Sequence, residues 1–160
     1  MPLPTFHAKL KTPFALLGIR ADDGRVAEIV FLSRDGETLS PRSRLAERAC
    51  AQIERYVGDP DFRFDLPLAE SGTPFQRRVW GKIAAIESGR TRSYGELARE
   101  LGSAARAVGQ ACGANPLPLV VPCHRVLAAD GIGGFAHHEG GFHLSVKRWL
   151  LAHEGAAAAR

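Results

Sequence analysis

Several features are scarce in this sequence of 160 residues. No apolar run approaches the roughly 20 residues needed to cross a bilayer, and the first ten residues lack the basic-then-apolar pattern of a signal peptide. The three cysteines, Cys50, Cys112 and Cys123, are widely spaced and form no Cys-x-x-Cys pair. This spacing argues against a disulfide framework and against a cysteine-rich zinc site. We therefore expect a protein of the reducing cytoplasm that has no membrane partner.

Acidic charge is scarce in the second half of the chain. Residues 1–70 carry ten Lys and Arg against eleven Asp and Glu, whereas residues 71–160 carry eleven against six. The first half therefore has a balance of −1 and the second half one of +5, which together give the net charge of +4. Such asymmetry favours a polyanionic partner there, because Lys and Arg displace condensed counterions from phosphates. The content of 45% hydrophobic and 24% charged residues is that of an ordinary globular protein, which excludes disordered and coiled-coil classes.

The first half has the pattern of a small α/β domain over residues 1–70. Two apolar segments, 14–20 and 25–32, flank an Asp-Gly pair, which predicts a β-hairpin. A helix is expected to begin at Ser40-Pro41, because apolar residues then recur every four positions and Gly58-Asp59-Pro60 follows as a stop. Residues 62–68 alternate like an edge strand. This half carries no recognisable chemistry.

Residues 71–160 form the second predicted domain, which is mostly helical. Thr73 with Gln76, and Ser93 with Glu96, make two capping boxes that start helices. Gly102 is expected to break the second of these, and a further helix should begin at Ser103. A last helix is expected from Ser145 to Glu154, and Trp80 and Trp149 are expected in the core. The helix, glycine turn and helix fit a DNA-binding helix-turn-helix or a plain helical hairpin, and spacing alone leaves both open.

Cys123 is the cysteine whose neighbours could make it reactive. Cys50 and Cys112 lie on amphipathic or small-residue helices, where a thiol is by default an inert apolar group. Cys123 is followed by His124 and Arg125, and such groups lower a thiol pKa toward neutrality when they contact it. Neighbours on an extended segment point to opposite faces, so a direct contact with His124 would need an unusual turn or a water. From this string a structural thiol and a nucleophile both remain open.

The wider sequence resembles the O6-alkylguanine-DNA alkyltransferases. The similarity covers about residues 72–155 and is carried by these strings: Asn115-Pro-Leu-Pro-Leu-Val-Val-Pro-Cys123-His-Arg-Val, Ala105-Arg-Ala-Val-Gly109, Ser93-Tyr94, Gly134-Phe135, and Lys147-Arg-Trp-Leu-Leu-Ala-His-Glu154-Gly. The resemblance implies a small RNase H-like α/β domain followed by a helical domain with a winged-helix-like helix-turn-helix unit. It also implies direct DNA repair, in which an alkyl group moves irreversibly from O6 of guanine, and less readily from O4 of thymine, to the protein.

The resemblance also implies the chemical roles. Cys123 is the alkyl acceptor, His124 deprotonates it through a water, and Glu154 orients His124. A Glu-His-water-Cys chain would supply the thiolate that displacement at an alkyl carbon needs. Asn115 ties the recognition helix to the active-site segment. Because the product is a thioether, each molecule acts once.

Contacts with DNA follow from the same resemblance. Arg106 enters the duplex and fills the space of the flipped nucleotide, while the small residues Ala107 and Gly109 let the helix approach the minor groove. Tyr94 helps rotate the nucleotide and donates its hydroxyl to the leaving guanine. The base pocket is expected to be lined by Tyr94, Pro118, Val126, Phe135 and Ala136. The partner is double-stranded DNA carrying O6-alkylguanine, and we expect a monomer.

The sequence departs from the family pattern in the loop 136–143, which is about four residues longer. Its histidines have no partner cysteines, so we expect neither a metal nor a cofactor. Bulk in this loop predicts that methyl adducts react better than benzyl-sized ones. The alternatives are a non-catalytic alkyltransferase-like binder of alkylated DNA, which would have tryptophan at the place of Cys123, a helix-turn-helix regulator and a thiol hydrolase.

Overall fold

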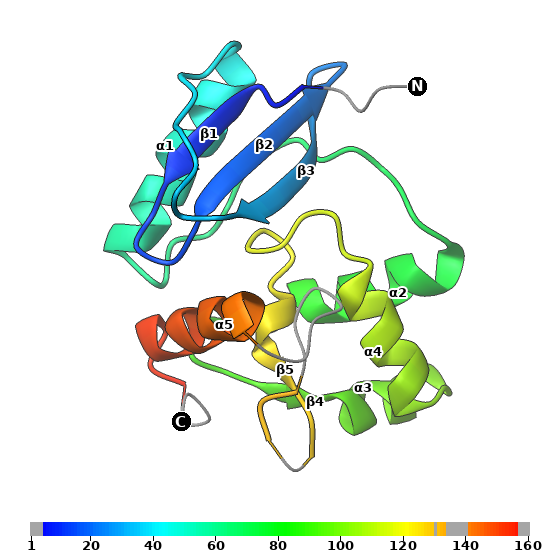
Figure 1. The fold of residues 1–160 in the computed structure, drawn as a ribbon. Helices are drawn as coiled ribbons and strands as arrows, with labels where there is room; N and C mark the ends of the chain where they lie inside the picture. Colours follow the sequence, from blue (N-terminus) through cyan, green and yellow to red (C-terminus); the bar gives the residue numbers. More distant parts are fainter. Residues whose placement is uncertain (1–4, 130, 134–140, 157–160) are drawn as a thin grey trace. The chain divides into compact units, whose positions relative to one another are not determined.

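The computed structural model describes residues 5–129, 131–133 and 141–156. It is a mixed α/β fold, as expected, and divides into two compact units, residues 1–70 and 71–160 (Figure 1). Each unit is treated by itself below. Among the described residues, no helix combines the length and the apolar character that a membrane span requires.

An antiparallel sheet forms the centre of the first unit. Its strands β1 (Ala8–Lys11), β2 (Leu16–Asp22) and β3 (Arg25–Leu32) follow one another in space in that order. The predicted hairpin is confirmed, with Asp22 opposite Arg25 and a two-residue turn at Asp23-Gly24. Both turn residues have positive φ, 50° and 74°, which is the backbone that an Asp-Gly hairpin turn requires.

Helix α1 (Arg44–Gly58) buries one side against this sheet, through Ala46, Ala49, Cys50, Ile53 and Tyr56. The predicted start at Ser40-Pro41 was wrong, because the backbone before Ser43 pairs with the first strand region. Leu39 N donates to Lys9 O at 3.0 Å and Arg42 N donates to His7 O at 2.8 Å. Ser43 is the N-cap, and its hydroxyl accepts the Ala46 N–H at 3.1 Å.

The predicted edge strand over residues 62–68 forms only at its end. Leu68 makes a parallel bridge with Val26, whose N–H donates to Pro67 O at 2.8 Å. Further back, the backbone of Asp65 is bound to the side chain of Gln52 in both directions, at 2.8 and 2.9 Å. Those side-chain bonds take the place of a strand ladder.

The second unit contains the helices α2 (Pro74–Ala84), α3 (Tyr94–Leu101), α4 (Ala105–Gly113) and α5 (Gly141–His153). Both predicted capping boxes are present. Helix α5 begins four residues earlier than expected, at Gly141, and ends at His153, one residue earlier than expected. Its buried residues are Leu144, Val146, Lys147, Leu150 and Leu151.

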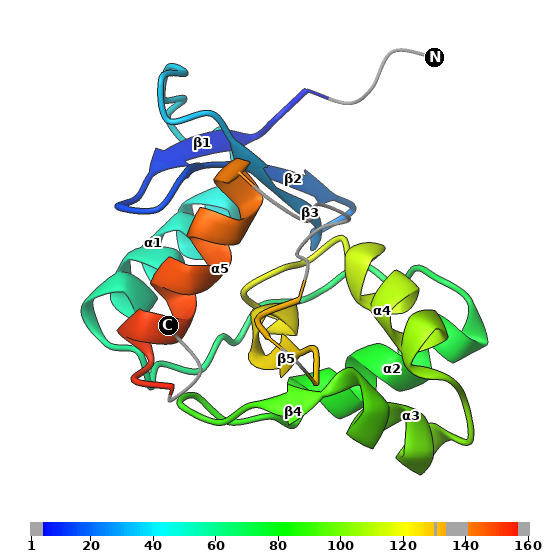
Figure 2. The ribbon, with the colours of Figure 1, turned by 60° about the horizontal axis from the view of Figure 1, so that its bottom comes forward.

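A tight turn joins α3 to α4, which pack on each other (Figure 2). Gly102 has φ +63° and ends α3, and Ser103 N donates back to Ala98 O at 2.8 Å. Because this N–H closes α3, Ser103 does not begin the next helix as predicted. The N-cap of α4 is Ala104, and the helix begins at Ala105.

A short parallel pair that the sequence did not predict joins β4 (Arg92–Ser93) to β5 (Val126–Leu127). Its register places Arg92 opposite Val126 and Ser93 opposite Leu127. Because β4 leads directly into α3 and β5 follows the 3-10 helix η1 (Cys123–Arg125), this pair fixes the start of α3 beside the segment that contains Cys123.

The two tryptophans are half-buried, so their placement in the core was wrong. Trp80 Nε1 donates to Ala111 O at 2.8 Å and so links α2 to α4. Trp149 stacks on His153 with ring centroids 4.7 Å apart. Trp80 thus lies at the contact between two helices, and Trp149 packs along its own helix, so neither indole lies at the centre of the unit.

Candidate active site

Cys123 begins η1, a single 3-10 turn. Its N–H donates to Val121 O at 2.8 Å, and Arg125 N donates to Pro122 O at 2.9 Å. The segment is therefore a turn and not extended chain, which removes the geometric objection to Cys123 and His124 acting together. Upstream, Leu119 is buried with φ +74°, in a loop closed by the Val121 N to Leu117 O bond of 2.9 Å.

Asn115 connects the end of α4 to the thiol. Its Nδ2 donates to Val121 O at 2.8 Å and to Cys123 Sγ at 3.2 Å. Its Oδ1 accepts the Leu117 N–H at 2.9 Å. The side chain thus fixes both ends of the loop between α4 and η1, and a donor on sulfur favours the thiolate.

Behind the thiol lies a buried group of three charged or titratable side chains. His124 Nε2 is 2.9 Å from Glu154 Oε2, and neither side chain has solvent exposure. Arg125 donates to both oxygens of the same carboxylate, from Nε to Oε1 at 2.9 Å and from a terminal nitrogen to Oε2 at 2.8 Å. This bidentate pair neutralises the buried Glu154, and Arg125 also donates to the Ile86 carbonyl.

His124 Nδ1 is the one buried side-chain nitrogen or oxygen without a hydrogen-bond partner in the part of the chain that the structure describes. The Glu154 carboxylate accepts a hydrogen bond from His124 Nε2, so Nε2 carries the ring proton and Nδ1 has a free lone pair. An unpaired acceptor is costly to bury, so its presence in a packed interior suggests a function.

Burial has the largest effect on the electrostatics of the thiol. Burial raises the pKa of Cys123 above its ordinary value, while the Asn115 hydrogen bond and the charge of Lys147 oppose this increase. The sequence left open whether His124 and Arg125 contact the thiol and lower its pKa. They do not lower it, because the Arg125 guanidinium pairs with the Glu154 carboxylate, and because burial lowers the pKa of His124 more than Glu154 raises it. The resting pair is a neutral thiol and a neutral imidazole.

Lys147 is a site residue that the sequence analysis missed. Its side chain is fully buried, and Nζ donates to Val126 O at 2.8 Å and lies 5.9 Å from the centroid of the Tyr94 ring. Burial lowers its pKa to about 8, against the opposing effect of Cys123 and Cys112. A signal was present in the sequence, because Lys147 occupies an apolar-stripe position between Leu144 and Leu151.

Tyr94 is the first residue of α3 and directly follows β4. It is half-buried, and burial raises the pKa of its phenol well above the ordinary range. Val126 and Pro118, predicted to line the base pocket, are both buried. The Val126 carbonyl accepts the hydrogen bond from Lys147 Nζ. The predicted pocket residues Phe135 and Ala136, like most of the long loop, lie outside the described residues.

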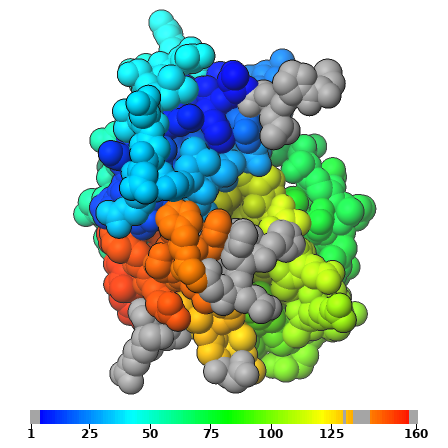
Figure 3. All heavy atoms as spheres, viewed as in Figure 1, coloured from blue at the N-terminus to red at the C-terminus, as the bar shows by residue number. Residues whose placement is uncertain are grey.

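Helix α4 presents the predicted DNA-contacting residues with graded exposure. Arg106 is exposed, Ala107 and Gly109 are half-buried, and Val108 is fully buried. Among the described residues, no carboxylate pairs with Arg106. The space-filling view shows the side chains of α3 and α4, yellow-green, on the outside of the second unit (Figure 3).

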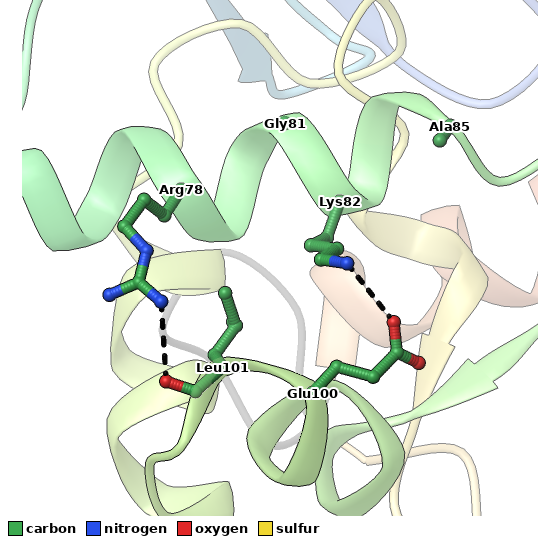
Figure 4. Close-up of a pocket in the computed structure, with 6 residues that line it drawn as sticks. All are labelled: Arg78, Gly81, Lys82, Ala85, Glu100 and Leu101. Carbon is green, nitrogen blue, oxygen red and sulfur yellow. Dashed lines mark hydrogen bonds and ion pairs between the residues drawn. The ribbon is translucent and has the colours of Figure 1, made fainter.

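A groove between α2 and α3 has a volume of about 510 Å³ (Figure 4). Its polar lining groups bind one another, since Lys82 pairs with Glu100 at 3.2 Å and Arg78 donates to Leu101 O at 3.4 Å. None of the predicted site residues lines it. Within the described ranges, no cluster of three or more His, Cys, Asp or Glu side chains has the arrangement of a metal site.

The chain is similar to known proteins over most of its length. The family model for the 6-O-methylguanine DNA methyltransferase DNA-binding domain matches residues 74–156. A probable methylated-DNA–protein-cysteine methyltransferase of Acanthamoeba polyphaga mimivirus is 36% identical over 148 residues, which cover 91% of this chain and 93% of that protein. The constitutive methylated-DNA–protein-cysteine methyltransferase of Bacillus subtilis is 36% identical over 159 residues, with the same coverages of 91% and 93%.

Solved structures are similar over nearly the whole chain. The crystal structure of Mycobacterium tuberculosis O6-methylguanine methyltransferase matches with a TM-score of 0.78 and 34% identity, covering 94% of this chain and 93% of that one. A complex with DNA from the same organism matches with a TM-score of 0.74 and 35% identity, covering 94% of each chain. The resemblance drawn from the motifs is thus confirmed, and the chain belongs to the 6-O-methylguanine DNA methyltransferase family.

Proposed function

We propose that this protein repairs double-stranded DNA by direct reversal. It flips O6-alkylguanine, and less readily O4-alkylthymine, out of the duplex and transfers the alkyl group to Cys123. The observation that carries the proposal is the buried Glu154–His124 pair, which leaves His124 Nδ1 unpaired in the turn that begins with Cys123. Membership of the family supports the same reaction.

The chemistry is a displacement at the alkyl carbon. The Cys123 thiol loses its proton through a water to His124 Nδ1, and the imidazolium that forms is balanced by Glu154. Sulfur then forms a bond to the alkyl carbon as the bond to O6 breaks. The product is a thioether that ordinary hydrolysis does not reverse, so each molecule acts once. Because the resting thiol is neutral, its activation depends on this proton transfer.

Tyr94 stabilises the leaving guanine. Negative charge builds on the base as the bond to O6 breaks, and a hydroxyl donor placed there lowers the barrier. The raised pKa of Tyr94 keeps its hydroxyl protonated at neutral pH, so it remains a donor. Pro118, Val126, Phe135 and Ala136 complete the proposed pocket around the base.

DNA engagement is assigned to α3 and α4 as a winged-helix-like helix-turn-helix unit. Arg106 would enter the minor groove and fill the space of the flipped nucleotide, at an unstacking cost of a few kcal/mol that other contacts offset. Its exposure on α4 supports this role, and half-buried Ala107 and Gly109 leave the helix slim enough to approach closely.

The two units divide the work in this proposal. Residues 71–160 bind DNA and accept the alkyl group, while residues 1–70 form a supporting α/β domain with RNase H-like topology. The antiparallel order β1-β2-β3 followed by α1 supports that topology. We further propose that the protein is a monomer and that it works in a reducing cytoplasm; the three free thiols support the reducing compartment.

The test is to incubate the protein with a duplex that contains O6-methylguanine and to weigh its peptides. We expect a gain of one methyl group on the peptide with Cys123, which Cys123→Ser abolishes. Cys50→Ser, a matched change in α1, should leave the transfer intact. Tight binding of the damaged duplex without any mass gain would select the non-catalytic alkyltransferase-like binder instead.

A further inference from the structure

Two glycines from different segments lie against opposite edges of the Tyr94 ring. A Cβ on Gly109 of α4 would lie 4.0 Å from Cδ1 and Cε1 of that ring, which is ordinary contact. A Cβ on Gly133, in the loop after β5, would lie 3.1 Å from Cε2 and 3.4 Å from the hydroxyl oxygen. The ring therefore occupies a slot between α4 and this loop, beneath the ammonium of Lys147.

The loop side of this slot has no room for a side chain. At Gly133 the backbone has φ +74°, and a Cβ would also lie 3.2 Å from Ala128 N. The backbone cannot easily retreat, because the same loop is closed by a bridge between Ala128 and Gly131. A side chain at this position must therefore push the Tyr94 ring toward α4 or open the loop.

We propose that Gly133 is a positioning residue for alkyl transfer, whose missing side chain sets the Tyr94 hydroxyl at the leaving base. The inference rests on the proposed function. Hydrogen bonds that form in the transition state depend on donor placement within about half an ångström. Gly133 should therefore govern the rate of transfer from bound DNA rather than the affinity for DNA.

The test compares three Gly→Ala variants. Gly133→Ala adds the Cβ that meets Tyr94. Gly24→Ala, in the first unit, has the same φ of +74° with open space around its Cβ, and Gly131→Ala lies in the same loop, also in open space. The first control matches the backbone strain, and the second matches the place in the loop.

We measure single-turnover methyl transfer at saturating O6-methylguanine duplex, and separately the affinity for an undamaged duplex. Gly133→Ala should slow transfer about tenfold, with affinity unchanged, while both controls stay within about twofold of the wild type. Gly133→Asn is a second variant, since Asn tolerates left-handed backbone but still carries a Cβ. It should be slowed as well.

A double-mutant cycle identifies the route of the effect. In a Tyr94→Phe background, which has no hydroxyl to misplace, Gly133→Ala should cause little further slowing. The same tenfold loss in both backgrounds, or a Gly133→Ala protein as fast as Gly24→Ala, would overturn the inference while leaving the proposed function intact. A wild-type protein that transfers no methyl group would overturn both.

Discussion

His124 Nε2 and Glu154 Oε2 lie 2.9 Å apart with both side chains sealed from solvent, and the same carboxylate accepts two hydrogen bonds from Arg125. The carboxylate is thus the shared acceptor of a histidine that is neutral at rest and an arginine that is charged. Because a buried charge without its partner is costly, this arrangement ties the chemistry of the site to the stability of the second unit.

Glu154→Gln should lower both the stability of the protein and the rate of alkyl transfer. The amide replaces one acceptor oxygen with a donor that faces His124 or Arg125, and it leaves the arginine charge buried without a counter-ion. We expect the free energy of unfolding to fall by about 3–5 kcal/mol and transfer to slow at least about tenfold, as measured by urea unfolding and single-turnover kinetics. Glu100→Gln removes an exposed ion-pair carboxylate instead and should lower the free energy of unfolding far less, because solvent screens that pair. Equal costs for the two variants would contradict the role of Glu154.

Asn115→Asp should make the thiol a weaker nucleophile. The substitution removes the N–H that donates to Cys123 Sγ and to Val121 O, and it adds negative charge beside the sulfur. Both changes disfavour the thiolate, so the pKa of Cys123 should rise further and transfer should slow. Peptide-resolved alkylation of Cys123 across pH measures the first effect. A thiol pKa equal to that of the wild type would show that the bond at 3.2 Å has no electrostatic role.

The pH dependence of Cys123 itself should be alkaline. Burial raises the thiol pKa above its ordinary value of 9.0, so the thiolate fraction at neutral pH is smaller than for an exposed cysteine, and it grows as pH rises through the raised pKa. Labelling by iodoacetamide, followed on the Cys123 peptide, should have its midpoint above pH 9. The urea-unfolded chain is the control and should return to the ordinary midpoint. A plateau already reached near about pH 7 would instead indicate a preformed thiolate.

Lys147→Met should change how stability depends on pH. Because burial lowers the pKa of Lys147 from 10.5 to about 8, the unfolded chain holds a proton between those values that the folded protein has released. The free energy of unfolding gains a contribution that rises with pH across this window. Urea unfolding at several pH values should show this rise in the wild type relative to Lys147→Met, since the other groups titrate in both proteins. Parallel curves for the two proteins would contradict a lowered pKa.

Arg106→Ala should separate flipping from chemistry. If the exposed guanidinium fills the space of the flipped nucleotide, its loss weakens binding to damaged duplex and slows transfer from it. The free base O6-methylguanine needs no flipping and should react almost as with the wild type. Arg34→Ala removes an exposed charge from the first unit and serves as the control. An equal loss with both substrates would show that Arg106 supports something other than flipping.

Much of the local structure followed from the sequence. The Asp-Gly hairpin and both capping boxes formed as expected, because these patterns satisfy backbone hydrogen bonds with side chains or turns only a few residues away. The starts of α1 and α4 did not. Their flanking N–H groups bind β1 or close the preceding helix, and such competition depends on where other segments lie.

The order of residues alone identified the family, and through that resemblance the roles proposed for Cys123, His124 and Glu154, because the family's motifs are short, specific strings. Only the folded chain decided that Arg125 binds Glu154 rather than the thiol, that Lys147 lies inside the site, and that the β4–β5 pair holds Tyr94 beside the Cys123 segment. The physical reason is that burial and long-range pairing set charge and position, and both arise from contacts between segments about 20 to 35 residues apart, which no local pattern encodes.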